Sequence, residues 1–420
     1  MKACAQCQRL YGDEAGFCPI DGTELRSVDE VQVPADPKDP RLGARLCGGR
    51  YLVRRVVADG GMGRVYQAYD VPERRSVALK VLHEDVAADD VAVERFKREF
   101  SLSAQLPHAH IVEVFDFQRT EDRSYALVME FLEGEELRMT LKREKVLPPE
   151  RVIRMLAQLA VGLDEAHRRN VVHRDIKPDN IFLCGTPEGD VVKLLDFGSV
   201  RDNSEGAKKL TVLGTTIGSP YYMSPEQAQG LRELDHRADV WSVAAIAYEC
   251  LTGKLPFAGS SGPSILLSIL TKEPEPPSIA GKAHGVPEAL DDVLSDALAK
   301  DMKTRTNSLG ELADRVGEAY GLGGGAPDWV DMAEAELKAA IEEARNRPPT
   351  PPWQPAPEAA GPAGAAPLGA PVGVPPTLSP FSDGGDYVMG LPGGPPWGLI
   401  VAIAAIVSAV LAAVLYVALR

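Results

Sequence analysis

The stretch from His173 to Asn180 constrains this chain more than any other part of its sequence. It reads His-Arg-Asp-Ile-Lys-Pro-Asp-Asn, so it places a carboxylate, an ammonium group and an amide close together. Asp175 could accept the proton of a substrate hydroxyl, Lys177 could stabilise developing phosphoryl charge, and Asn180 could hold a metal ion beside phosphates. The stretch therefore predicts phosphoryl transfer, provided that the other parts of such a site surround it in the right order.

A glycine-rich turn precedes that stretch. Residues 58–66 read Ala-Asp-Gly-Gly-Met-Gly-Arg-Val-Tyr and lie between two strand-like segments. Glycines in such a turn let backbone N–H groups approach phosphates without interference from Cβ atoms. On its own, the turn could equally be an ordinary hairpin.

A lysine follows on an apolar strand. Lys80 lies in Val-Ala-Leu-Lys-Val-Leu, where a buried ammonium group needs an anionic partner. ATP phosphates and an acid are the expected partners. A helix expected over 91–106 and ended by Pro107 carries that acid, with Glu99 favoured over Glu94.

A second carboxylate follows the catalytic stretch. Asp196 comes directly after the apolar strand 191–195 and is followed by Phe197 and Gly198. Carboxylate and amide oxygens are ligands that magnesium accepts beside phosphates. Asp196 and Asn180 are therefore the candidate metal ligands.

Together these motifs resemble a bacterial, eukaryotic-like serine/threonine protein kinase over residues 51–320. The resemblance implies an α+β fold with a small β-rich lobe and a larger helical lobe. It implies that ATP and Mg²⁺ (or Mn²⁺) bind between the lobes and that proteins with Ser or Thr hydroxyls are substrates. Ala58 departs from the family pattern because it replaces the first glycine. The implied nucleotide-binding residues are Val57, Ala58, Gly60, Gly63, Val65, Ala78, Lys80, Glu130, Leu132 and Leu183.

The resemblance also implies a switch. Residues 199–223 would be an activation segment, and Arg174 could capture a phosphate on it. Autophosphorylation is expected at Thr211, with Thr215 and Thr216 as alternatives. A rival hypothesis is a pseudokinase scaffold that binds partners without transferring phosphate. Ala58 is its only support.

The first residues predict a small metal site. Cys4, Cys7, Cys18 and Asp21 resemble the ligand pattern of a zinc ribbon over residues 1–27, with Asp21 in place of a fourth cysteine. The alternatives are a ribbon that has lost its metal, a disordered tail, or a module whose main role is binding a protein or nucleic acid. Acids and prolines in residues 28–50 predict a linker.

The C-terminal side changes in composition. Residues 321–347 predict a short acidic helix, and the Pro-, Ala- and Gly-rich residues 348–396 predict a disordered tether. Residues 397–420 contain an uncharged apolar run long enough to cross a bilayer as one helix. This predicts a tail-anchored, single-pass protein of the inner membrane with its ATP-dependent domain in the cytoplasm. Small residues in the helix allow a homodimer.

Charge and cysteine content limit the remaining classes. The net charge of −15 argues against nucleic-acid binding through a bulk basic surface. The six cysteines are not arranged like a secreted disulfide framework, which favours a reducing compartment.

Overall fold

The computed structural model describes residues 1–197, 220–231 and 234–347. They lie in a compact unit that runs from Met1 to Thr350. Three expectations fall outside the described residues: the phosphosites Thr211, Thr215 and Thr216, the tether, and the membrane span. Among the residues that are described, no helix is both long and apolar enough to cross a bilayer.

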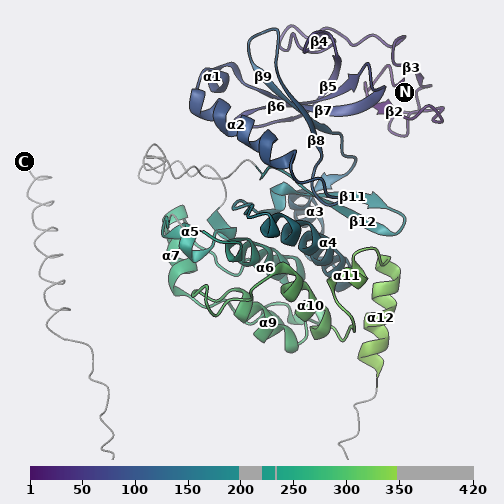
Figure 1. The fold of residues 1–420 in the computed structure, drawn as a ribbon. Coiled ribbons are helices and arrows are strands. Elements are labelled where there is room, and N and C mark those ends of the chain that lie inside the picture. The colour runs from purple at the N-terminus through teal and green to yellow at the C-terminus, as the bar shows by residue number, and fades with distance from the viewer. Residues whose placement is uncertain (198–219, 232–233, 348–420) are drawn as a thin grey trace, which may run out of the picture. The chain divides into compact units, whose positions relative to one another are not determined.

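The upper lobe in Figure 1 is built on an antiparallel sheet of six strands. Its strand order is β4-β5-β6-β7-β9-β8, and the glycine-rich turn joins β5 to β6. The strands form because apolar and β-branched residues pack on both sides of their middle section, where Tyr51, Val53, Tyr66 and Leu79 are fully buried. The strands are β4 (Arg45–Leu46), β5 (Tyr51–Asp59), β6 (Gly63–Asp70), β7 (Arg75–Leu82), β8 (Val114–Arg119) and β9 (Tyr125–Glu130).

Helices α1 (Glu84–Ala87) and α2 (Asp90–Ser103) follow β7 and lie along this sheet (Figure 1). The Asp89 side chain caps α2 by accepting a hydrogen bond from Val91 N. The helix ends at Ser103, earlier than the expected 91–106, so Pro107 does not terminate it. Packing fixes the position of α2 on the sheet, because the ring of Phe96 contacts Phe117 of β8 edge to face.

The lower lobe is mainly helical. Helix α4 (Pro149–Arg168) passes through its core, and one apolar cluster joins it to α6 (Arg237–Thr252), α9 (Ala289–Ala297) and α10 (Leu309–Ala319). Trp241 of α6 is fully buried and stacks on Phe257. The other helices and 3₁₀ turns of this lobe are α3 (Leu137–Glu144), η1 (Pro178–Asn180), η4 (Pro220–Tyr222), α5 (Pro225–Ala228), α7 (Gly262–Thr271), α8 (Pro277–Ala280) and η5 (Lys282–His284).

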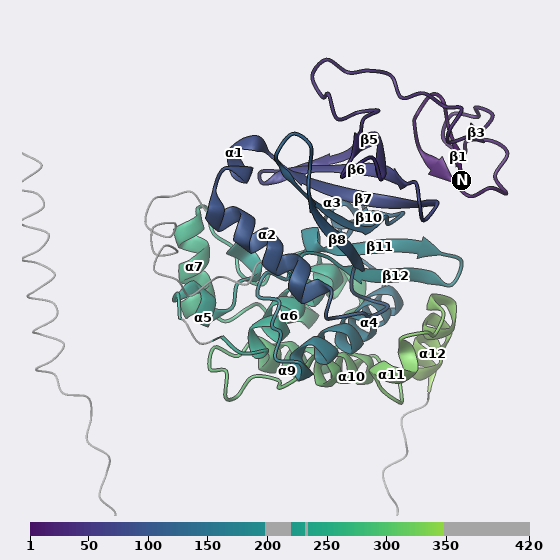
Figure 2. The ribbon, with the colours of Figure 1, turned by 45° about the horizontal axis from the view of Figure 1, so that its top comes forward.

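A second, smaller sheet lies between the six-stranded sheet and the helices (Figures 1 and 2). It consists of β10 (Glu135–Glu136), β11 (Ile181–Thr186) and β12 (Gly189–Leu194), in the order β10-β11-β12. The catalytic stretch 173–180 leads directly into β11, and Asp196 follows β12. Because β11 and β12 pair from Ile181↔Leu194 outwards, both functional segments lie at the same end of this hairpin.

The N-terminal residues form a third small sheet, in the order β2-β1-β3, from β1 (Lys2–Ala3), β2 (Leu10–Tyr11) and β3 (Arg26–Ser27). Residues 28–50, expected to be only a linker, are instead packed against the upper lobe. Val28 and Val31 are buried beside Tyr69 of β6, and Leu46 joins the core of the six-stranded sheet. The prediction of a linker was based on the acids and prolines of this segment and did not take its apolar residues into account.

The compact fold continues beyond residue 320, the expected end of the catalytic domain. Helices α11 (Ala326–Trp329) and α12 (Glu334–Asn346) occupy the segment in which a short acidic helix was predicted. Trp329, Leu337 and Ile341 are buried in the same apolar core as α4. The Glu334 carboxylate also accepts a hydrogen bond from Asp190 N on β12. These residues are therefore part of the lower lobe.

Candidate phosphoryl-transfer site

Lys80 lies on β7, and its ammonium group bridges two carboxylates. Its Nζ lies 3.2 Å from Glu99 Oε1 on α2 and 3.0 Å from Asp196 Oδ1 after β12. Burial alone would lower the pKa of Lys80, but the carboxylates of Asp196 and Glu99 raise it above its ordinary value. The lysine is therefore charged in this site, and it ties the two lobes together.

The two acids that bind Lys80 differ in their environments. Burial raises the pKa of Glu99 to about 7, although the charge of Lys80 acts in the opposite direction. Partial desolvation also raises the pKa of Asp196, but Lys80 outweighs it and leaves the pKa below its usual value. The Asp196 side chain is 41% exposed, whereas that of Glu99 is 10% exposed. Asp196 is thus the carboxylate available to a cation, and Glu99 is the one that fixes Lys80.

The catalytic stretch brings its three functional side chains together. Lys177 Nζ donates to Asp175 Oδ2 over 2.7 Å, and Asn180 Nδ2 donates to the Asp175 carbonyl over 2.8 Å. Asn180 Nδ2 also lies 3.3 Å from Asp175 Oδ2. Because the amide nitrogen of Asn180 points to Asp175, its Oδ1 is the atom that could bind a cation.

Asp239, a buried residue of α6, fixes the backbone at the start of the catalytic stretch 173–180. The carboxylate of Asp239, which is fully buried, accepts hydrogen bonds from the backbone N–H groups of His173 and Arg174, at 2.9 and 2.8 Å. Arg174 and Asp196 have φ values of 67° and 55°, which are unfavourable for residues with a side chain. Their surroundings stabilise this backbone, and the Asp196 side chain reaches Lys80 from it.

A buried ion pair fixes helix α5 in the lower lobe. Arg305 Nη1 and Nη2 lie 2.8 and 2.9 Å from the two carboxylate oxygens of Glu226. Gln227, next in the chain, was not predicted to matter. Its Nε2 donates to the Arg174 carbonyl over 2.6 Å and so links α5 to the catalytic stretch. Its sequence signal was limited to a polar side chain directly after Ser224-Pro225-Glu226.

Most of the expected nucleotide-binding residues lie on β5, β6, β7 and the turn between β5 and β6, and Leu183 lies on β11. Ala58 pairs with Val65 across β5 and β6, and its φ is negative, so replacing glycine there causes no backbone strain. Val57 is 45% exposed and is therefore not a core residue. Ala78, opposite Met129 on β9, is 7% exposed.

The segment after β9 is the candidate adenine-binding backbone. The N–H of Glu130 already donates to the Glu113 carbonyl, so Leu132 is the better candidate donor. The side chain of Glu130 accepts a hydrogen bond from Lys193 Nζ over 2.6 Å and has a structural role. Leu183 on β11 is 4% exposed and belongs to the core of the lower lobe.

The four predicted metal ligands at the N-terminus also meet. The ligand atoms of Cys4, Cys7, Cys18 and Asp21 all lie within 4.8 Å of one another. The sulfur atoms of Cys7 and Cys18 are 3.6 Å apart, close to the separation of about 3.8 Å that tetrahedral geometry with Zn–S bonds of about 2.3 Å requires. The geometry of this cluster fits a zinc ion.

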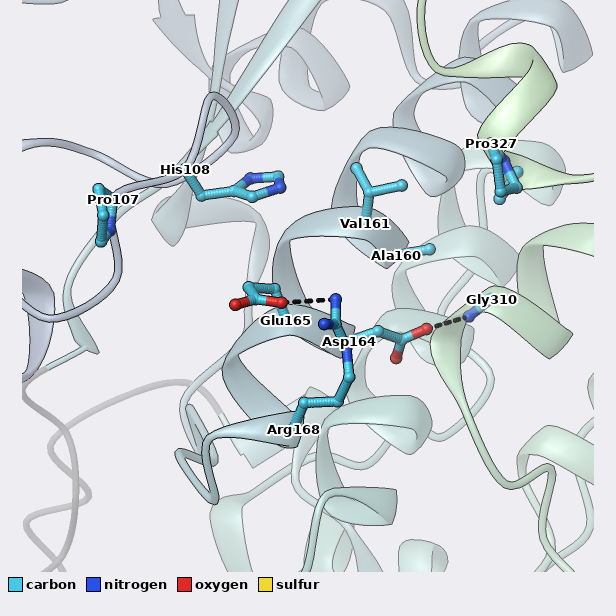
Figure 3. A pocket seen from close by; sticks show the side chains of 10 residues that line it. Pro107, His108, Ala160, Val161, Asp164, Glu165, Arg168, Gly310 and Pro327 are labelled. Carbon is cyan, nitrogen blue, oxygen red and sulfur yellow. Dashed lines mark hydrogen bonds and ion pairs between the residues drawn. The ribbon is translucent and has the colours of Figure 1, made fainter.

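A separate cavity of about 490 Å³ lies on the lower lobe, beside α4. Figure 3 shows that Glu165 points to Arg168 and that Asp164 points to the N–H of Gly310 at the start of α10. The lining includes none of the residues expected to bind nucleotide or to act in catalysis. Asp164 serves the fold by capping α10, and we assign the cavity no role in the reaction.

Comparisons with known proteins agree with this geometry. The model of the protein kinase domain matches residues 51–315. The serine/threonine-protein kinase pkn3 of Myxococcus xanthus is 37% identical over 262 residues, which are 62% of this chain and 48% of that protein. PknH of Mycobacterium bovis is 32% identical over 397 residues, which are 89% of this chain and 64% of that protein. The chain therefore spans about half to two thirds of the length of these relatives.

Solved structures support the fold. The crystal structure of the Mycobacterium tuberculosis PknI kinase domain aligns with a TM-score of 0.52 at 29% identity, covering 67% of this chain and 98% of that one. The prediction of a two-lobed kinase fold is confirmed by these matches. The chain therefore belongs to the protein kinase family, within which its matched relatives are bacterial serine/threonine kinases.

Proposed function

We propose that this protein transfers the γ-phosphoryl group of ATP to Ser and Thr hydroxyls of other proteins. The observation that carries the proposal is the assembled contact of Lys80 with both Glu99 and Asp196. This contact joins the nucleotide-binding sheet to the catalytic lobe in one site.

Each residue has a role that follows from its position. Lys80, fixed by Glu99, would bind the α- and β-phosphates. Asp196 and Asn180 would hold Mg²⁺ or Mn²⁺, which neutralises phosphate charge when it is bound. Asp175 would orient the acceptor hydroxyl and take its proton, and Lys177, 2.7 Å from Asp175, would stabilise charge on the transferred group.

A phosphotransfer assay with a matched control tests this proposal. We expect the full chain to transfer radiolabelled phosphate from ATP to a generic Ser/Thr-containing protein, and Asp175→Asn to lower kcat at least about 100-fold. Asp179→Asn serves as control, because Asp179 lies in the same stretch but its side chain is 43% exposed and is 3.6 Å from Arg138. Equal transfer by wild type and Asp175→Asn would favour the pseudokinase alternative.

We also propose that phosphorylation of the activation segment, at Thr211 or else at Thr215 or Thr216, switches the enzyme on. The support is Arg174, whose buried Nε has no hydrogen-bond partner among the described residues. A phosphate carries nearly two negative charges at neutral pH and would pair with it. Phosphosite mapping after incubation with ATP and Mg²⁺ tests this. If Thr211→Ala, Thr215→Ala and Thr216→Ala all keep full activity, the switch lies elsewhere.

We propose further that Cys4, Cys7, Cys18 and Asp21 bind a structural zinc ion, because three thiolates and a carboxylate suit zinc in number and chemistry. Metal analysis of the purified full chain tests this. We expect about one zinc per chain and its loss in Cys7→Ser. Cys184→Ser, at a cysteine outside the cluster, should keep the metal. A wild-type chain without metal at neutral pH would contradict the proposal.

The final part of the proposal concerns location. The uncharged apolar run 398–419 supports a single membrane-spanning helix, with the kinase domain on the cytoplasmic side where ATP is available. Cell fractionation tests this: the full chain should be in the inner-membrane fraction and a chain ending at residue 396 should not be. The same distribution for both chains would rule the anchor out.

A further inference from the structure

The glycine-rich turn is held by a network of charged residues that reaches outside the kinase-family match. Arg64, the residue after Gly63, donates through Nε to Asp59 Oδ2 over 3.0 Å. Its Nη1 donates to Asp39 Oδ2 over 2.8 Å. The hydrogen bonds that Arg64 donates to Asp59 and, next in importance, to Asp39 raise the pKa of its guanidinium. Arg64 thus bridges one side of the turn to a segment that precedes the lobe in sequence.

Asp39 is built into the lobe and is not a surface residue. Its side chain is 6% exposed, and Tyr66 of β6, which is fully buried, donates its hydroxyl to Asp39 Oδ2 over 2.9 Å. Asp39 therefore contacts two residues of β6, Arg64 and Tyr66, on the strand that follows the turn. Arg41 N also donates to Asp39 Oδ1 over 3.2 Å, and the Arg41 side chain anchors the segment by an ion pair with Asp122 at 2.6 Å.

The opposite side of the turn is held by His83, which follows β7. His83 Nε2 lies 2.9 Å from the Gly60 carbonyl and 3.2 Å from Asp59 Oδ1. The His83 N–H also donates to the Met62 carbonyl over 3.1 Å. Both ends of the turn are thereby connected to the body of the lobe, on one side through His83 and on the other through Arg64 and Asp39.

This arrangement matters because glycine backbone loses the most conformational freedom when it becomes ordered. A turn containing Gly60, Gly61 and Gly63 binds phosphates more weakly if it must be ordered during binding, and more tightly if it is ordered beforehand. Arg64 and Asp59 alone only close the turn on itself. Asp39 adds the connection to a buried, fixed point.

We propose that Asp39 is a positioning residue for the nucleotide: through Arg64 it holds the glycine-rich turn in the conformation that receives the ATP phosphates. The inference rests on the proposed kinase function. It extends the nucleotide site to a residue outside the matched segment 51–315. Residues 28–50 then have a part in nucleotide binding that a linker would not have.

Asp39→Asn tests the proposal, because the amide oxygen can still accept the Tyr66 hydroxyl while the charge that holds Arg64 is lost. We expect the KM for ATP to rise about 3- to 10-fold, as for loss of a partly buried charged hydrogen bond. The kcat should change less than about twofold, and the KM for the protein acceptor should not change. In an Arg64→Gln background, Asp39→Asn should have little further effect, because the pathway through Arg64 is already broken.

Two control variants separate positioning from mere attachment of the segment. Asp122→Asn weakens the Arg41 anchor without touching the turn. Asp36→Asn changes an exposed residue of the same segment, whose carboxylate accepts a hydrogen bond from the nearby Lys38 N. Both should keep the wild-type KM for ATP, even if Asp122→Asn lowers the melting temperature.

The proposal is overturned if Asp39→Asn keeps the wild-type KM for ATP, if Asp122→Asn raises it equally, or if the effect is undiminished in Arg64→Gln. A wild-type chain without phosphotransfer would refute the proposed function instead. In that case the dissociation constant of a fluorescent ATP analogue, measured on the same variants, decides the role of Asp39 alone.

Discussion

The contacts of Lys80 show whether the candidate phosphoryl-transfer site is assembled. It lies between Glu99 and Asp196, and its ammonium group can keep both contacts only while α2 and the end of β12 stay where they are. A buried cation that loses one of its partners is left poorly compensated. A movement of α2 that takes Glu99 away from Lys80 would therefore change the balance of charge at the nucleotide site.

Replacing Glu99 tests this coupling. Glu99→Gln keeps the size of the side chain but removes one of the two negative charges that attract the Lys80 ammonium group, so that only the charge of Asp196 remains. We expect kcat/KM for ATP to fall about 10- to 100-fold, because Lys80 is then drawn towards Asp196 and away from the phosphates. Glu94→Gln, at an exposed position of the same helix where the carboxylate pairs with Lys97, should stay within about twofold of wild type. Similar losses in both variants would mean that α2 is merely destabilised.

A second prediction at this scale concerns pH. His167 lies 2.8 Å from Asp239 and 3.8 Å from Asp164. Burial lowers the pKa of His167, but the two carboxylates prevail and raise it from 6.5 to about 9. Since the folded pKa exceeds the unfolded one, the protonated form stabilises the fold. This contribution is complete below pH 6.5 and is lost as the pH rises through 9.

Denaturant unfolding at several pH values measures the effect. We expect the free energy of unfolding to fall by up to roughly 3 kcal/mol between pH 6.5 and 9.5, because each pKa unit is worth about 1.4 kcal/mol. His167→Gln should have a flatter profile over this range. His236→Gln, at a partly exposed histidine nearby, should retain the wild-type slope. A slope that is the same in all three proteins would contradict the role of His167.

At the scale of elements, the lower lobe depends on a segment beyond the family match. Trp329 of α11 is 1% exposed, and its ring lies where a Cβ atom on Gly317 of α10 would be. The indole Nε1 donates to the Gly323 carbonyl over 3.2 Å. These contacts make α11 and α12 part of the core. Removing them should therefore lower the stability of the whole lower lobe.

Trp329→Ala tests this dependence. We expect a loss of about 3–5 kcal/mol in the free energy of unfolding, as for other large buried aromatic residues. Ile279→Ala, at an apolar residue that is 59% exposed, should change stability by less than about 0.5 kcal/mol. Equal and small losses in both variants, measured by chemical denaturation, would show that the segment is not integral to the fold.

Some of these elements could be predicted from the sequence, and others could not. The strand with Lys80, the helix with Glu99 and the hairpin before Asp196 were predictable because each has an apolar pattern next to a motif of fixed spacing. The end of α2 and the packing of residues 28–50 were not, because they depend on contacts with distant residues such as Phe117 and Tyr69. Gln227 and Asp39 were missed for the same reason, since each acts through a partner far away in sequence.

At the scale of the whole molecule, the N-terminal cluster is attached to the upper lobe by a buried arginine. Arg54 of β5, 1% exposed, donates to the Val31 carbonyl and to Gln8 Oε1, both over 2.7 Å. Gln8 directly follows Cys7 in the cluster. Unfolding of the cluster would therefore leave a buried guanidinium group without these acceptors, which is costly.

If the cluster holds the zinc ion proposed above, removing the metal should also destabilise the kinase domain. We expect a strong zinc chelator to lower the melting temperature of the upper lobe by roughly 2–6 °C, a shift that corresponds to about 1–2 kcal/mol in a domain of this size. The Cys7→Ser variant should begin at the lower temperature and show no response to the chelator. An unchanged wild-type melting temperature after proven loss of the metal would contradict the coupling.

Phosphotransfer by Asp175→Asn remains the most direct test of the central claim, because Asp175 is joined to both Lys177 and Asn180 in the assembled site. The measurement is incorporation of radiolabelled phosphate from ATP into a Ser/Thr protein, for wild type, Asp175→Asn and the control Asp179→Asn. We predict transfer by wild type and the control and a loss of at least about 100-fold in Asp175→Asn. Equal transfer by wild type and Asp175→Asn, or none by wild type, would contradict it.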